Sequence, residues 1–179
     1  ASGPMKAFAV EFYKNGKLLR NKIKNHPRYP YHLLREEMQE FILDKLQLLI
    51  ERKLIKGIGE NGTEYTVIAQ ILDLPKEILR LIQKFDFTKK NPKLIYINTG
   101  ETMISLQDSI LVTFLNLAGF DILFFVPTGY QSVENYFAEK LMEEHQIGEY
   151  KYDMQVPDLN NISTNSTRSS WRRKLFRRG

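Results

Sequence analysis

Two stretches of the chain read alike: LIYINTGE at residues 94–101 and ILFFVPTGY at residues 122–130. Each begins with a short apolar run rich in β-branched or aromatic residues, which is typical of a strand covered on both faces. Each run ends in a Thr-Gly turn, and a segment with helical spacing follows. This repeated order predicts a βαβα unit with parallel strands, in which small ligands bind beyond the carboxyl ends of the strands.

The segments that precede this unit indicate helices. Apolar residues recur at three- and four-residue steps over residues 31–54, and residues 64–87 predict two short helices, the second with Pro75 in its first turn. A strand is predicted over residues 8–13, before an Asn15-Gly16 turn. We therefore expect an α/β fold in which a helical N-terminal half packs on a small Rossmann-like parallel sheet.

The later elements are predicted in the same way. Ser105 with Asp108 three residues on indicates a helix start. Ser132 and Glu134 predict the start of another helix, and residues 150–156 read as a short edge strand. By composition the chain divides into a mainly helical subdomain at 5–90, a Rossmann-like βαβα subdomain at 91–158, and a polar linker with a basic tail at 159–179.

The composition is that of a globular protein, with 42% apolar and 26% charged residues in 179. No apolar run reaches the roughly 18 residues that span a bilayer, and the first residues lack the pattern of a signal peptide. The absence of cysteine excludes disulfides, thiol catalysis and cysteine-rich metal sites. The three histidines do not have metal-ligand spacing, so we expect no metal site, and we expect a cytoplasmic protein without a transmembrane segment.

The positive charge is concentrated at one end. The net charge is +5, but six of the 26 basic residues lie in the last dozen positions, which leaves 20 bases against 21 acids elsewhere. An aromatic residue joins these cations in the candidate partner-binding set of Arg168, Trp171, Arg172, Arg173, Lys174, Arg177 and Arg178. Such a tail suits an acidic partner, RNA or an anionic membrane surface, or it docks on its own domain. Residues 64–84 have the shape of a helix-turn-helix, but any helical hairpin gives that pattern, so we do not expect sequence-specific DNA binding.

The two Thr-Gly turns are the candidate ligand site. The residues singled out are Asn98, Thr99, Gly100 and Glu101 in the first turn, and Thr128, Gly129, Tyr130 and Gln131 in the second. Glycine lets backbone N–H groups approach a ligand, and the start of a helix favours an anion. Neither G-x-G-x-x-G nor G-x-x-x-x-G-K-[ST] is present, so a nucleotide fingerprint is lacking. The alternative is that both are ordinary turns between a strand and a helix.

Three carboxylates lie near the same predicted edge. Glu101, Asp108 and Glu134 could pair for general acid–base work or hold a divalent cation. Alternatively, Asp108 and Glu134 only favour helix N-termini through the backbone dipole. The sequence identifies no catalytic residue and no cofactor.

A longer run carries a family resemblance. Residues 119–134, GFDILFFVPTGYQSVE, together with the Arg-Arg-Gly terminus, resemble the bacterial YceG-like family. This family is described as a component of a "biosynthetic module" and is associated with toxic-anion (tellurite) resistance and Ter-type stress proteins. Because its members are longer, the resemblance implies that this chain is the C-terminal portion of one, and it transfers no catalytic residues.

Two functions follow from these observations. The first is a lobe that binds an anionic or nucleotide-like metabolite and is transferase-like. The second is a non-enzymatic interaction module that docks to stress-response partners or an anionic surface through its basic tail.

Overall fold

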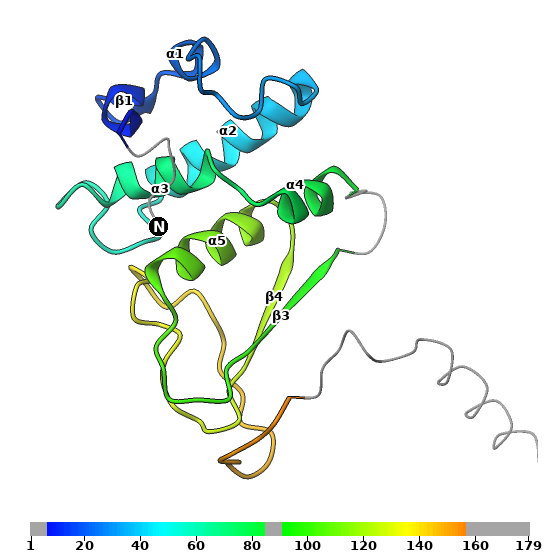
Figure 1. Cartoon of the computed structure of the whole chain (residues 1–179). Helices are drawn as coiled ribbons and strands as arrows, with labels where there is room; N and C mark the ends of the chain where they lie inside the picture. The colour runs from blue at the N-terminus through cyan, green and yellow to red at the C-terminus, as the bar shows by residue number, and fades with distance from the viewer. Residues whose placement is uncertain (1–6, 85–90, 157–179) are drawn as a thin grey trace, which may run out of the picture.

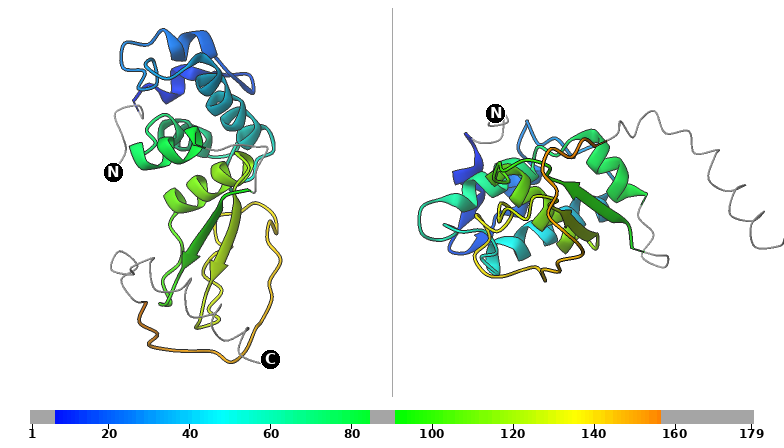
Figure 2. Two further views of the ribbon diagram at one scale, coloured as in Figure 1. Left: turned by 90° about the vertical axis from the view of Figure 1, so that its right-hand side faces the viewer. Right: turned by 90° about the horizontal axis from the view of Figure 1, so that it is seen from below.

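The computed structural model describes residues 7–84 and 91–156, and within them the chain has a mixed α/β fold, which confirms the expected class. Most helices gather at one end of the molecule, two strands extend toward the other end, and α5 lies between them (Figures 1 and 2). The elements in chain order are η1 (Ala9–Phe12), β1 (Tyr13–Lys14), β2 (Lys17–Leu18), α1 (Arg20–Lys24), α2 (Glu36–Glu51), α3 (Thr63–Ile71), α4 (Lys76–Gln83), β3 (Lys93–Ile97), α5 (Leu106–Leu117) and β4 (Asp121–Phe125).

The N-terminal segment forms a small hairpin. β1 pairs antiparallel with β2, and the connecting Asn15 and Gly16 both have positive φ, as the sequence predicts. The strand predicted over residues 8–13 is wrong for most of its length, because residues 9–12 form the 3-10 helix η1. Ala9 and Phe12 are both fully buried, and their spacing of three is that of one 3-10 turn.

The helical end is built on α2. Its buried side chains follow the helical repeat, with Ile42, Leu46 and Leu49 inaccessible to solvent. α3 and α4 confirm the two short helices predicted for residues 64–87. α3 begins after Gly62, whose φ of 84° is one that a residue with a side chain rarely adopts.

The two apolar runs are neighbouring parallel strands. β3 pairs with β4 in a register that places Lys93 opposite Asp121 and Ile97 opposite Phe125. α5 connects them and packs on one face of the pair, as Figure 1 shows. The prediction that these strands are covered on both faces is wrong, because their burial alternates and every second side chain is exposed.

The chain after β4 has no regular secondary structure through residue 156, apart from one isolated bridge. The helix predicted from Ser132 and the edge strand predicted for residues 150–156 are therefore both wrong. Instead, residues 136–138 run antiparallel to residues 54–56, with Lys56 N donating to Tyr136 O and Ala138 N donating to Leu54 O. This pairing places Phe137 opposite Ile55, and both side chains are buried.

One hydrophobic core joins the helical end to the strand end. α5 contacts α2 and α3 on one side and β4 on the other. Its residues Ile110 and Phe114 are fully buried in the same cluster as Leu46 of α2 and Ile68 of α3. The position of β3 and β4 is thus fixed through α5.

Candidate functional site

The two Thr-Gly turns lie side by side at the carboxyl ends of β3 and β4. Asn98 N donates to Phe125 O at 3.0 Å, which extends the strand pairing by one step. Ile104 N donates to Ser132 O at 2.9 Å, and Asn98 Nδ2 donates to Ser132 Oγ at 2.9 Å. The fold therefore brings both predicted turns to one rim, as the parallel pairing requires.

The first turn is organised by Asn98. Its Oδ1 accepts from Gly100 N at 3.2 Å, and its Nδ2 also donates to Thr102 O at 2.8 Å. The Asn98 side chain is thus engaged in shaping the turn, as asparagine often is. Gly100 and Glu101 are exposed and Thr99 is half-buried, so these three residues present the accessible surface of this turn.

The second turn is partly covered by a later segment. Lys151 N donates to Pro127 O at 2.8 Å, and the Tyr150 ring lies on Gly129. A Cβ at Gly129 would meet Tyr150 Cε1 at 2.1 Å, and the φ of Gly129 is +67°, so both the space and the backbone require glycine. Thr128 is buried, and its Oγ1 accepts from Tyr130 N at 3.3 Å, whereas Tyr130 and Gln131 are exposed.

A helix begins after the first turn but not after the second. Ser105 caps α5: Asp108 N donates to Ser105 Oγ at 3.0 Å, and Ser105 Oγ donates to Asp108 Oδ2 at 2.7 Å. This confirms the predicted helix start, and it places a carboxylate at the end of the helix that would otherwise attract an anion. Burial, with Asp108 adding, raises the pKa of Tyr96, whose hydroxyl donates to the same carboxylate at 3.4 Å.

The three carboxylates have different surroundings. Asp108 is half-buried and occupied with Ser105, while Glu101 and Glu134 are exposed. In residues 7–84 and 91–156, no group of three His, Asp or Glu side chains could hold a metal ion. The contacts of Asp108 with Ser105 are those of a helix start, as in the alternative, and its carboxylate also accepts from the Tyr96 hydroxyl. Glu134 begins no helix, so the alternative is wrong for that residue.

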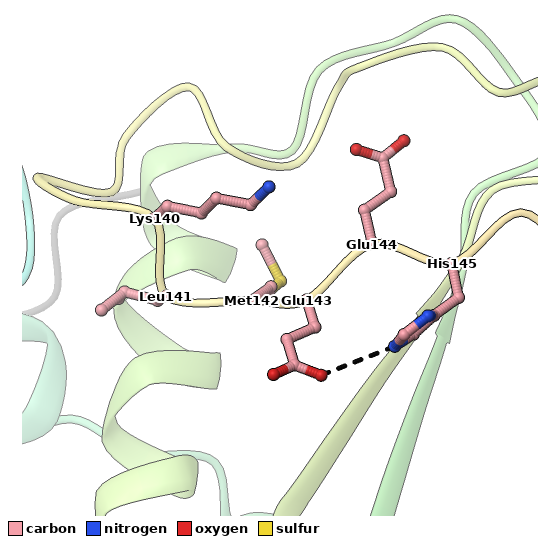
Figure 3. A pocket seen from close by; sticks show the side chains of 6 residues that line it. All are labelled: Lys140, Leu141, Met142, Glu143, Glu144 and His145. Carbon is pink, nitrogen blue, oxygen red and sulfur yellow. Dashed lines mark ion pairs between the residues drawn. The ribbon is translucent and has the colours of Figure 1, made fainter.

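A hollow elsewhere on the surface is formed by a single segment, residues 140–145 (Figure 3). Its lining includes an ion pair of 3.5 Å between His145 Nε2 and Glu143 Oε2, both side chains being exposed. These residues are neighbours in the chain, so the fold brings no separate elements together there. At the rim, by contrast, the turns after β3 and β4 bring polar groups together, although α5 separates these two strands in the sequence.

Two predicted features concern other parts of the chain. The tail cations and Trp171 lie outside the residues that the structure describes. Among the described residues, no helix combines the length and apolar character that crossing a membrane demands.

The cover that Tyr150 gives to Gly129 was not predicted, since nothing local in the sequence links positions 21 residues apart.

The chain is similar to proteins of one known family. The model of the YceG domain family matches residues 3–170. This chain belongs to the YceG domain family. A relative, "Uncharacterized protein YceG" of Bacillus subtilis (strain 168), is 31% identical over 93 residues. That match covers 50% of this chain and 17% of the relative. No solved structure matches.

Proposed function

We propose that this chain is one lobe of a ligand-binding protein, and that an anionic or nucleotide-like metabolite binds at the rim of the two Thr-Gly turns. The observation that carries the proposal is the joining of the turns through Asn98 and Ser132, 2.9 Å apart between Nδ2 and Oγ. Ligands of open parallel sheets bind at this edge. The Rossmann-like description of the sheet and a transferase-like activity belong to this proposal.

The rim residues divide into two groups by their contacts. Asn98 and Thr128 form the framework, because their polar atoms already bond within the turns. The accessible residues are Thr99, Gly100, Glu101, Tyr130 and Gln131. In the proposal Thr99 and Glu101 offer backbone and hydroxyl donors, Gly100 leaves room for the ligand because it has no side chain, and Tyr130 offers a ring for stacking on a base.

Gly100 gives the sharper test of the site, because its surroundings tolerate a side chain. An added Cβ would have Thr102 Oγ1 as its nearest neighbour at 3.8 Å, and no positive φ is required. Gly100→Leu should therefore keep the fold and reduce the room at the rim. Gly129 does not allow this test, since a side chain there would displace Tyr150.

The experiment is a thermal-shift titration of the chain with inorganic phosphate and, separately, with a nucleoside triphosphate. A ligand that binds only the folded state raises the unfolding temperature with its concentration. We expect a shift for the parent chain and for Glu37→Leu, an exposed change on α2, and none for Gly100→Leu. If neither probe raises the midpoint, or if Gly100→Leu responds like the parent, the rim is not the site.

Glu101 tests the charge of the ligand. Its exposed carboxylate repels an anion, so Glu101→Gln should strengthen phosphate binding at low ionic strength. Weaker binding in this variant would instead indicate that the carboxylate accepts hydrogen bonds from the ligand, as it would from a sugar hydroxyl.

The family resemblance extends the proposal to a cellular role. On this view the lobe acts in the bacterial cytoplasm in toxic-anion or tellurite resistance, alongside Ter-type stress proteins. The chain's match covers a minor part of its relative's length, so the activity of a whole YceG-family protein is part of the proposal. The alternative, docking to stress-response partners through the basic tail, concerns residues beyond those that the structure describes.

A further inference from the structure

The strand pair leaves one face open to solvent. Ile95, Ile97, Leu123 and Phe125 are 59, 38, 57 and 36% exposed. The register places Ile95 opposite Leu123 and Ile97 opposite Phe125, so the four form one continuous patch, here called the open face. Parallel sheets are covered on both faces, and contiguous apolar patches mark sites of contact. The open face therefore calls for a covering segment.

The segment beside the end of the strands is acidic. Residues 134–153 carry six acids and two lysines, all of them exposed. The acids are Glu134, Glu139, Glu143, Glu144, Glu149 and Asp153. The hydrogen bond from Lys151 N to Pro127 O ties this segment to the turn after β4. Glu149 and Asp153, each two residues from Lys151, therefore lie near the carboxyl end of β4, where their charge attracts a cationic segment and repels an anionic membrane.

The tail has the matching chemistry. Residues 171–178, WRRKLFRR, combine three apolar residues with five cations, and Arg168 adds a sixth. Trp171 and Leu175 are four residues apart, the spacing that brings two side chains to one face of a helix. We propose that this tail docks in cis on the open face, with its apolar residues on the strands and its cations toward the acidic segment.

The chain is long enough for this contact. Fourteen residues, 157–170, separate Val156 from Trp171, and an extended chain of that length spans at most about 50 Å. β3 and β4, of five residues each, are only about 17 Å long. Since Lys151 is already held against the turn after β4, the tail can reach any part of the open face.

Trp171 reports on the docking directly, because it is the only tryptophan of the chain. We expect its emission in the intact 179-residue chain to be blue-shifted, and protected from acrylamide, relative to the chain unfolded in urea. Ile95→Thr combined with Leu123→Thr should move the emission to the unfolded position while keeping the far-UV circular dichroism. Leu33→Thr is the matched control, since Leu33 is 87% exposed and lies at the helical end.

The contribution of charge to the docking of the tail is tested separately. Glu149→Lys combined with Asp153→Asn should reduce the protection of Trp171, as should about 1 M NaCl, in which charges more than a few Å apart are screened. Unprotected Trp171 in the intact chain would overturn the proposal, and so would protection that the open-face variants leave unchanged. If the protection of Trp171 from acrylamide is lost when the protein is diluted, the open face is instead covered by a second copy of the chain. A blue shift seen only with phosphatidylserine vesicles would assign the tail to a membrane. Either result would also overturn docking in cis.

Discussion

Tyr31 is the largest fully buried side chain within residues 7–84 and 91–156, and its hydroxyl bridges two parts of the helical end. It donates to Ile71 O at 2.6 Å and accepts from Leu74 N at 2.9 Å, so it joins the end of α3 to the start of α4. Tyr31→Phe leaves a buried carbonyl and a buried N–H without this partner. We expect it to lower the free energy of unfolding by about 1–3 kcal/mol, measured by urea denaturation.

Tyr29 provides the matched comparison. Its ring packs against Tyr31, but its buried hydroxyl has no hydrogen-bond partner among the described residues. Burial raises the pKa of Tyr29 to about 12, as expected for a phenol away from water. Tyr29→Phe removes the unsatisfied group, so it should leave the stability unchanged or raise it. A loss as large as that of Tyr31→Phe would contradict this account of both residues.

Glu40 should make the stability depend on pH. Lys24 donates a hydrogen bond to its carboxylate, Arg20 donates another at 2.8 Å, and these lower the pKa of Glu40 in the folded state. A lowered folded-state pKa gives stability that is present above the ordinary value of 4.5 and is lost as the pH falls through the folded value. The unfolding free energy of Glu40→Gln should therefore fall less between pH 6 and pH 3 than that of the parent chain. Glu37→Gln controls for the loss of one negative charge from the same helix, and equal slopes for parent and Glu40→Gln would refute the prediction.

At the scale of single elements, α5 depends on its cap. Ser105 Oγ accepts from Asp108 N at 3.0 Å and so satisfies one of the N–H groups at the start of the helix. Ser105→Ala should cost about 1 kcal/mol of stability, which lowers the thermal midpoint by about 2–4 °C in a chain of this size. Ser105→Thr keeps a hydroxyl and should restore most of the loss; a variant with threonine that is as unstable as alanine would mean that the cap is not the cause.

The elements also show which structural features local sequence patterns can predict. α5 and its capping residue were predicted correctly, because the apolar repeat and the Ser105–Asp108 spacing are both local signals. Val133, Phe137 and Leu141 have the same four-residue spacing, yet residues 132–141 are not helical. Phe137 is buried by pairing with Ile55, 82 residues earlier, and such long-range pairing overrides a short local repeat.

At the scale of the whole molecule, one core spans both ends. The cluster that contains Leu46 and Ile68 of the helical end also contains Phe114 of α5 and Phe120 before β4. Because neither end has a core of its own in this cluster, we expect a single unfolding transition. Far-UV circular dichroism and the near-UV tyrosine signal should give the same urea midpoint, and two separate midpoints would show that the ends unfold independently.

The rim of the candidate site could be predicted from the sequence in outline only. Parallel pairing of two similar strands is enough to bring Gly100 and Gly129 to one edge, and the contact of Asn98 with Ser132 agrees with it. The open face could not be predicted, because within the apolar runs 94–97 and 122–125 a strand covered on both faces and one covered on a single face have similar sequences. Nor could the cover of the second turn by Tyr150, which depends on how an irregular segment returns to the strands.

That cover has a consequence for how YceG-domain sequences can diverge. The Tyr150 ring occupies the space that a side chain at 129 would need, and a Cβ there would lie 2.1 Å from it. The two positions therefore cannot vary one at a time: a relative without glycine at 129 needs a small residue at 150 and, because φ at 129 is +67°, a residue such as asparagine that tolerates a positive φ. Alignments of the family should show these two distant columns changing together.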